Sequence, residues 1–336
     1  MKHLIVGAGA TLAEALALGI PRVQCPPVMT DFARKMWWNY SPYPLLDAYL
    51  RNQGYTNLGE DPRDLFFRLE ESGKENIERF MEFAWNNRSL DLAPYKSNLP
   101  PGFISGFRIT TADPSSKSQP TQENFWQNML YHGIGSPLSF FMDQCFFENG
   151  KGWKDFSQAK TISSRLTPND LVINLNFDTV FELALQQMGR DVCYVPNIQS
   201  PHEILVAKPH GSLNLIMNHE GFMFGQPEWL GMPQHPGYDS YSGLVPPRLN
   251  KNYAQHPFAE LIIKLIRDRT PQKIIMWGVG LTQSDTDLLS LYQGWAKSAD
   301  SIDVINPDQN VAANVHDLLK CDVKHYRNLT EWGSEN

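Results

Sequence analysis

The first fifteen residues, MKHLIVGAGATLAEA (1–15), contain the pattern that decides the fold. A short apolar run at residues 2–6 leads into the glycine-rich turn GAGAT (7–11), which is followed by residues that favour a helix. This order predicts a buried strand, a tight turn and a helix, which is the basic unit of an α/β fold. The apolar run is too short to cross a membrane, and the glycines and Glu14 fit a strand–turn–helix better than a signal peptide.

Four more short apolar runs predict further strands of one sheet. They are LVINL (171–175), ILVA (204–207), KIIMW (273–277) and IDVI (302–305). Nearly uninterrupted apolar runs are typical of parallel strands that are covered on both faces. Helical patterns occur between some of them, at residues 179–187, 258–269 and 285–297. The alternation predicts an α/β fold with a Rossmann-like, doubly wound parallel sheet.

Residues 30–165 have a different character. They are rich in helix formers and aromatic residues and contain no comparable run of strand residues. We interpret them as a mainly helical insertion, so that residues 1–29 and 166–336 form one discontinuous domain. Within the insertion, residues 97–122 are rich in Pro, Gly and Ser, which predicts a loop.

Large aromatic residues are concentrated in this insertion. The segment RKMWWNY (34–40) contains two tryptophans and a tyrosine, and further examples are Phe80, Phe83, Trp85, Phe125 and Trp126. One interpretation is that an ordinary core buries them. An insertion of this size does not easily bury all of them alone, and aromatic residues are enriched in the cores of interfaces. We therefore expect the chain to form a homo-oligomer.

The composition excludes several classes of protein. Hydrophobic residues make up 42% of the 336 residues and charged residues 19%, which supports a sizeable core and excludes global disorder. A formal net charge of −7 argues against broad, non-specific binding to nucleic acid. The four cysteines form no C-x-x-C pair, so we expect no bound metal, no disulfide framework and a reducing cytoplasm. No apolar run is long enough to predict a membrane span.

Glycines or polar residues follow the predicted strands, and this is where ligands bind in open α/β sheets. In GAGAT, glycines allow backbone N–H groups to approach a pyrophosphate at the N-terminus of a helix. Leu12 stands where the dinucleotide-binding fingerprint has its third glycine, so a simple tight turn is the alternative. Later in the chain, WGVGLTQSDTDLL (277–289) begins with a second glycine turn, and its Asp285 and Asp287 are expected to begin a helix.

Two other strand ends carry side chains suited to catalysis. Asn176 and Asp178 of NLNFDTVFE (174–182) follow an apolar strand. A helix cap would explain Asp178, but not two asparagines in a strand. In KPHG (208–211), Pro209 stiffens the chain and Gly211 permits a sharp turn around His210. Histidine titrates near neutral pH and suits the role of general base, whereas the alternative is a hydrogen-bonded structural histidine.

The order of these motifs resembles that of the sirtuin-like (SIR2) superfamily. It looks most like the bacterial SIR2-like NAD hydrolases of antiphage defence, over residues 1–25 and about 168–330. GAGAT is similar to the family's GAG turn, NFD (176–178) to its N-I-D, and His210–Gly211 to its catalytic His-Gly. GVGL (278–281) is similar to the family's second glycine turn, and Asn306 of VINPD (304–308) to its adenosine-ribose asparagine.

The resemblance implies which residues carry the function. It implies catalysis by Asn176, His210 and Asp178, without a metal. It implies that NAD, as substrate, is bound by a larger set: Gly7, Ala8, Gly9, Thr11, Gly211, Gly278, Gly280, Leu281 and Asn306. The expected products are nicotinamide and ADP-ribose, with a cyclised product left open. Single-domain effectors of this kind often act with a separately encoded ATPase or Argonaute-like protein, which is the partner that the resemblance implies.

Two departures from the family separate the possible activities. Protein-deacylating sirtuins usually have a zinc module of paired cysteines after the His-Gly, and this chain has no such pair. RVQ (22–24) stands where the family has D-F-R. NAD glycohydrolase activity is therefore the main expectation, in an effector that depletes NAD. The alternatives are a protein deacylase or ADP-ribosyltransferase, and a non-catalytic module that senses nucleotides and assembles.

Overall fold

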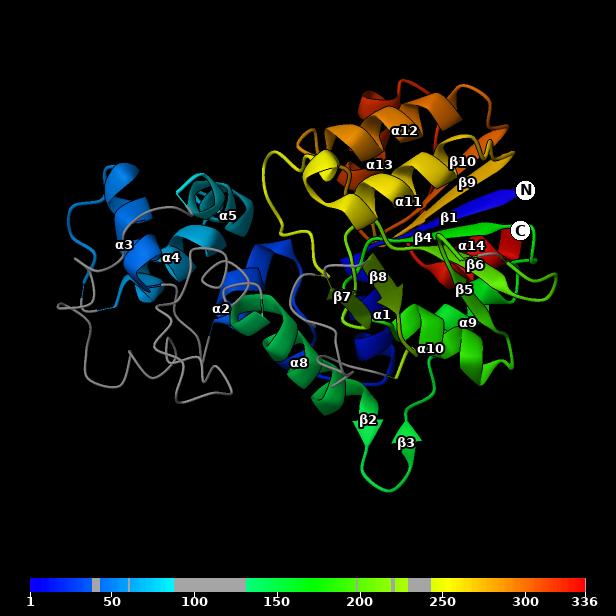
Figure 1. Cartoon of the computed structure of the whole chain (residues 1–336), viewed down its shortest axis with the longest axis horizontal. Coiled ribbons are helices and arrows are strands. Elements are labelled where there is room, and N and C mark those ends of the chain that lie inside the picture. Colours follow the sequence, from blue (N-terminus) through cyan, green and yellow to red (C-terminus); the bar gives the residue numbers. More distant parts are fainter. Residues whose placement is uncertain are drawn as a thin grey trace. The chain divides into compact units, whose positions relative to one another are not determined.

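The computed structural model describes residues 1–37, 43–59, 61–87, 131–197, 199–218, 221–228 and 243–335 (Figure 1). The chain divides into two compact units. The sheet unit comprises residues 1–26, 141–245 and 250–336, and the helical unit comprises residues 27–140 and 246–249. All the predicted site residues belong to the sheet unit.

The sheet unit is built on a seven-stranded, wholly parallel sheet. Its strands are β1 (Lys2–Val6), β4 (Leu171–Asn174), β5 (Val192–Tyr194), β6 (Ile204–Ala207), β9 (Lys273–Trp277), β10 (Ser301–Ile305) and β11 (Lys324–Tyr326). They lie in the order β11-β10-β9-β1-β4-β6-β5. The prediction of a Rossmann-like parallel α/β sheet is confirmed. The edge strands β5 and β11 were missed because three residues are too few to give a periodic signal.

Helices cover both faces of the sheet (Figure 1). They are α1 (Ala8–Ala17), α9 (Ser157–Ser163), α10 (Val180–Gln187), α11 (Pro257–Arg267), α12 (Thr286–Ala296), α13 (Gln309–Leu319) and α14 (Leu329–Glu335), with the short 3-10 helices η1 (Arg22–Gln24) and η5 (Tyr253–Gln255). Helix α9 packs against α1, α10 and α14, and α12 packs against α13. The described part of the unit also has two short antiparallel hairpins: β2 (Phe147–Glu148) with β3 (Gly152–Trp153), and β7 (Leu215–Asn218) with β8 (Gly221–Phe224).

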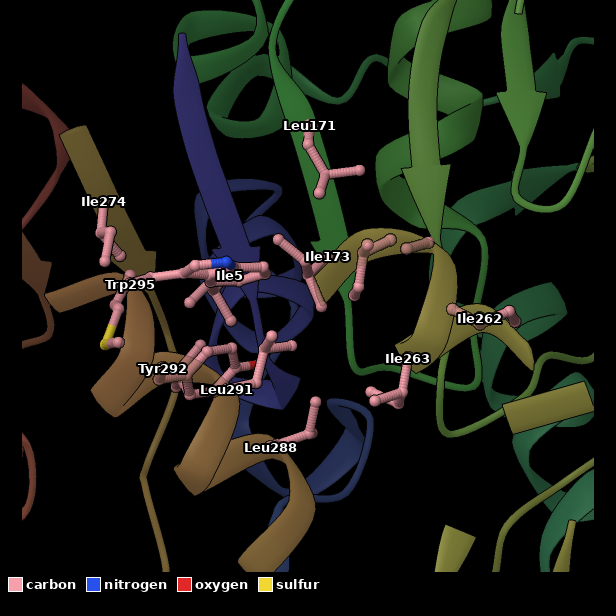
Figure 2. Close-up of a cluster of buried hydrophobic side chains, with 14 of the residues drawn as sticks. Ile5, Leu171, Ile173, Ile262, Ile263, Ile274, Leu288, Leu291, Tyr292 and Trp295 are labelled. Atoms are coloured by element: carbon pink, nitrogen blue, oxygen red, sulfur yellow. The ribbon is translucent and has the colours of Figure 1, made fainter. Parts of the chain in front are cut away.

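Apolar side chains of α11 and α12 form the core over one face of the sheet. Proline at the first position starts α11. Its buried residues recur at the three- and four-residue spacing of a helix, and Ile262 and Ile263 belong to this buried stripe. Figure 2 shows these side chains and those of α12, such as Leu288, near Ile5 and Ile173 of the central strands. Burying one such side chain stabilises the fold by about 1.5–3 kcal/mol, so this layer holds the sheet and its strand ends in place.

The helical unit has its own aromatic core. Trp37, Tyr49, Phe66 and Phe80 are buried there, with ring centroids 5.1–6.2 Å apart. The described elements of this unit are η2 (Met29–Asp31), α2 (Phe32–Met36), α3 (Tyr43–Asn52), α4 (Pro62–Glu71), α5 (Ile77–Asn86), η4 (Tyr131–Gly135) and α8 (Ser136–Phe146), the last of which crosses the unit boundary. An internal core thus accounts for Phe80 and for Trp37 of the RKMWWNY segment.

Much of the predicted insertion cannot be compared with the structure. The expected loop at 97–122 and the aromatic residues Phe125 and Trp126 lie outside the described residues. The helical insertion over residues 30–165 therefore stays a prediction. Residues 141–165 group with the sheet unit by their contacts. Over the described parts of the chain, no helix has the length and apolar character needed to cross a membrane.

Candidate active site

The predicted site residues meet at one edge of the sheet. All seven strands are parallel, so the turns after β1, β4, β6, β9 and β10 lie at the same edge. These five turns carry the residues singled out from the sequence: Gly7, Ala8, Gly9 and Thr11; Asn176 and Asp178; His210 and Gly211; Gly278, Gly280 and Leu281; and Asn306. β1 lies between β4 and β9, where the chain changes direction across the sheet, and such positions are the usual ligand sites of α/β folds.

The two glycine turns pack against each other through their backbones. Gly9 donates its N–H to the carbonyl of Gly278 at 3.0 Å, and Gly7 donates to Trp277 at 3.1 Å. A Cβ at Gly7 would lie 2.6 Å from the Gly278 oxygen, and one at Gly278, where φ is +63°, would lie 2.2 Å from the Ala10 nitrogen. Close packing therefore requires these glycines, whatever they bind. Ala8 is exposed in the first turn of α1, where backbone N–H groups have no partner within a helix.

The side-chain amide of Asn176 has a defined orientation. Its Nδ2 lies 3.0 Å from the Gly7 carbonyl and 3.0 Å from Oγ1 of Thr11. A carbonyl can only accept, so the amide nitrogen must face Gly7 and the amide oxygen must face the other way. No described residue donates a hydrogen bond to Oδ1 of Asn176. The only outward polar atom of this side chain is therefore an acceptor.

Asp178 connects the turn after β4 to α1. Its Oδ2 accepts a hydrogen bond from the Thr11 hydroxyl at 2.8 Å, and its Oδ1 accepts from the N–H of Val180 at 3.1 Å. The second contact tightens the turn before α10, but the N-cap of that helix is Thr179, so Asp178 is not the cap residue that the sequence offered as its alternative role. Burial raises the pKa of the Asp178 carboxyl above its ordinary value, although the charge of Lys208 and these hydrogen bonds lower it in part.

A buried ion pair lies behind these residues. Lys208 and Glu182 have no exposed side-chain surface, and Nζ of the lysine lies 3.0 Å from Oε1 of the glutamate. Lys208 also donates to the Asp178 carbonyl at 2.6 Å. Asn174 donates to both Glu182 oxygens, at 3.1 and 2.9 Å, and its Oδ1 accepts the N–H of Asn176 at 3.0 Å. The two asparagines thus differ: Asn174 is fully committed to the scaffold, and Asn176 presents an acceptor outward.

His210 is held between a backbone carbonyl and a carboxylate. Its Nδ1 lies 3.0 Å from the Leu175 oxygen, and its Nε2 lies 3.0 Å from Oδ2 of Asp285. The ring stacks near Tyr253, with centroids 6.0 Å apart. Its backbone carbonyl accepts the N–H of Val245 at 2.8 Å. Next to it, Gly211 has φ +85°, and a Cβ there would lie 1.8 Å from the Gly243 oxygen, so the sharp turn expected from the sequence needs glycine.

Asp285 was not predicted as a site residue. We expected it only to begin a helix, and it does precede α12, but its side chain makes no cap hydrogen bond. Its carboxylate instead meets His210, and it accepts the Tyr253 hydroxyl at 3.0 Å on each oxygen. The position of Asp285, shortly after a glycine turn at a strand end, is the signal that could have suggested this role. Lys208 and Glu182 were also not predicted as site residues. The signal that could have suggested Lys208 is a charged residue directly after an apolar strand.

The remaining predicted residues are not joined to this network by hydrogen bonds among the described residues. A Cβ at Gly280 would meet nothing within 4 Å. Leu281 is 9% exposed and packs into the core, so only its backbone is placed to contact a ligand. Asn306 accepts the N–H of Asp308 at 3.0 Å, which forms the turn before α13.

The chain matches no model of a protein family and no curated protein sequence significantly. In the described parts of the chain, no group of three or more His, Cys, Asp or Glu side chains is placed to hold a metal ion.

Proposed function

We propose that this protein is an NAD glycohydrolase, which cleaves the bond between nicotinamide and ribose to give nicotinamide and ADP-ribose. The observation that carries the proposal is the orientation of Asn176. Its amide is held by Gly7 and Thr11 so that an acceptor faces outward, at the same sheet edge as His210 and the N-terminus of α1. An acceptor, a histidine and a helix N-terminus together suit a ligand that carries both ribose hydroxyls and phosphates.

The chemistry follows from the charge of the substrate. The nicotinamide of NAD⁺ is a cationic leaving group, and it takes the electron pair of the broken C–N bond and leaves neutral, so it needs no acid. The ribose carbon becomes electron-deficient, and a water adds to it with loss of one proton. Oδ1 of Asn176 accepts a hydrogen bond from a ribose hydroxyl or from this water and orients it. His210 in its neutral form accepts the proton.

The other residues bind and position. The pyrophosphate lies at the first turn of α1, where Ala8 offers its backbone N–H; that of Gly9 is already bonded to Gly278. The resemblance gives Asp178 a place at the nicotinamide end. Because both of its oxygens already accept hydrogen bonds, we assign it a positioning role through Thr11. Asn306 binds the adenosine ribose, and the turns at Gly211 and at residues 278–281 line the rest of the ligand.

The biological role rests on the resemblance alone. We propose a cytoplasmic, NAD-depleting effector of antiphage defence that acts as a homo-oligomer. A separately encoded ATPase or Argonaute-like protein is the proposed activating partner. Neither a membrane nor direct binding to nucleic acid has a part in this proposal.

The test is nicotinamide release from NAD⁺ by the purified chain, followed by chromatography that also separates linear from cyclic ADP-ribose. His210→Ala and Asn176→Ala are each expected to lower the rate by about 10²–10⁴-fold. His316→Ala, on the exposed face of α13, is the matched control and should keep the full rate. Full turnover in either site variant, while it remains folded, would show that the site is assigned wrongly.

A further inference from the structure

Both ring nitrogens of His210 face hydrogen-bond acceptors. Nδ1 lies 3.0 Å from the Leu175 carbonyl oxygen, and Nε2 lies 3.0 Å from the carboxylate of Asp285. A carbonyl and an ionised carboxylate can only accept, so each contact needs a hydrogen on the ring nitrogen. The geometry therefore favours a hydrogen on each ring nitrogen. Such a ring has no lone pair with which to take a proton from a ribose hydroxyl or a water.

The surroundings of Asp285 keep its carboxyl group ionised. Burial alone raises the pKa of this carboxyl, but the hydrogen bond and charge of His210 outweigh it, with help from Lys251 and Tyr253, and the pKa lies below its usual value. The ammonium of Lys251 is 3.6 Å away, and the Tyr253 hydroxyl donates to both oxygens. On α12, Asp287 accepts the N–H of Tyr253 at 3.2 Å, and Tyr292 adds a second buried phenol.

We propose that Asp285 is a positioning residue that keeps Nε2 of the base His210 protonated and occupied in the ligand-free chain. Bound substrate then replaces Asp285 at Nε2. The inference rests on the proposed function, because it concerns the histidine assigned there as base. When the contact opens, the Nε2 proton leaves to solvent, and the neutral ring retains its hydrogen on Nδ1. That ring then accepts one proton from the substrate side.

Asp285 is the partner that moves in this proposal. His210 is fixed by its Nδ1 contact to the end of β4 and by the hydrogen bond from Val245 to its own carbonyl. Asp285 instead lies at the start of α12, after the exposed residues Thr282 and Gln283. Displacement of Asp285 frees Nε2 of His210 without moving the ring. The rate of NAD⁺ hydrolysis therefore stays low until a ligand hydroxyl competes with Asp285 for Nε2.

The direct test is ¹⁵N NMR of the histidine side chains in the ligand-free chain at pH 7.5. The His210 signals, identified by their loss in His210→Gln, should show both nitrogens protonated. In Asp285→Asn the side-chain amide donates to Nε2, so that nitrogen should move to the unprotonated range. Asp285→Glu, which retains the carboxylate, should keep the ring doubly protonated. Asp287→Asn removes the same charge from the same helix and should leave the His210 signals unchanged.

Nicotinamide release by the same variants is the second readout. Asp285→Asn should release nicotinamide about tenfold faster than the unmodified chain at low NAD⁺, because a charge-assisted hydrogen bond no longer holds the base closed. Asp285→Ser serves as a second charge-free variant, and thermal melting verifies that each variant is folded. Unchanged His210 signals in the charge-free variants, or a slower release once the ring is neutral, would overturn the proposal. The expected signals without any release would support the contact and contradict the glycohydrolase function instead.

Discussion

Replacing Lys208 with methionine is expected to destabilise the sheet unit by about 3–5 kcal/mol, because it leaves a buried charge without its partner. Both side chains of the Lys208–Glu182 pair are fully buried, and among the described residues the Glu182 carboxylate has no other polar contacts than two hydrogen bonds from Asn174. For a unit of this size the loss corresponds to a melting temperature lower by about 10 °C. Glu182→Gln strands the lysine ammonium in the same way and should cost about 3 kcal/mol.

The double variant Lys208→Met, Glu182→Gln has neither charge, so it should be destabilised by less than the sum of the single changes. We expect a coupling free energy of about 2 kcal/mol or more from urea unfolding of all four proteins. Lys151→Met, which breaks an exposed ion pair with Glu148, is the control and should leave the free energy of unfolding unchanged. Additive single effects would refute the reasoning, because they would mean that the two charges do not compensate each other in the core.

Three further predictions concern other parts of the molecule. Burial lowers the pKa of His3 to about 4, so between that value and about pH 6.5 the folded chain binds fewer protons than the unfolded chain. The free energy of unfolding should therefore fall as the pH falls below 6.5, by about 3 kcal/mol at pH 4. His3→Leu should remove this part of the pH dependence of unfolding. Gly278→Ala should cost at least about 1–3 kcal/mol and weaken NAD⁺ binding in calorimetry, because it forces a Cβ against Ala10 at a positive φ. Gly294→Ala, in α12 and outside the site, meets open space and should weaken neither stability nor binding. Light scattering of the chain at micromolar concentration should give the mass of a homo-oligomer, and a monomer mass that does not change on concentration would contradict this.

The strands were predictable where the sequence signal is long and local. Residues 2–6 and 273–277 are uninterrupted enough to mark buried parallel strands, and both are strands with those bounds. The rule that ligands bind at carboxyl ends of strands then brought Asn176 and His210 to one sheet edge. Neither step requires knowledge of how distant side chains pair.

The contacts that define the chemistry depend on such pairing and were not predictable. Asp285 lies 75 positions after His210, and their contact depends on how the turn before α12 directs one carboxylate. The different roles of Asn174 and Asn176 follow from where Glu182 and Gly7 lie in space. The glycines of the two turns looked like phosphate-binding residues, and only the structure shows that Gly7 and Gly278 also need to be glycine in order to pack together.

The position of β1 has a consequence for how the protein is made. This strand is synthesised before the other strands of its sheet, yet it lies inside the sheet, with His3 beside Leu171 on one side and Lys2 beside Lys273 on the other. At roughly 5–20 residues per second, the second edge stays uncovered for on the order of 15–50 s after β1 is synthesised. During that time KHLIV has an unpaired edge, which exposes the nascent chain to aggregation and to binding by chaperones. Any chain that terminates before β9 keeps one edge of its central strand exposed permanently.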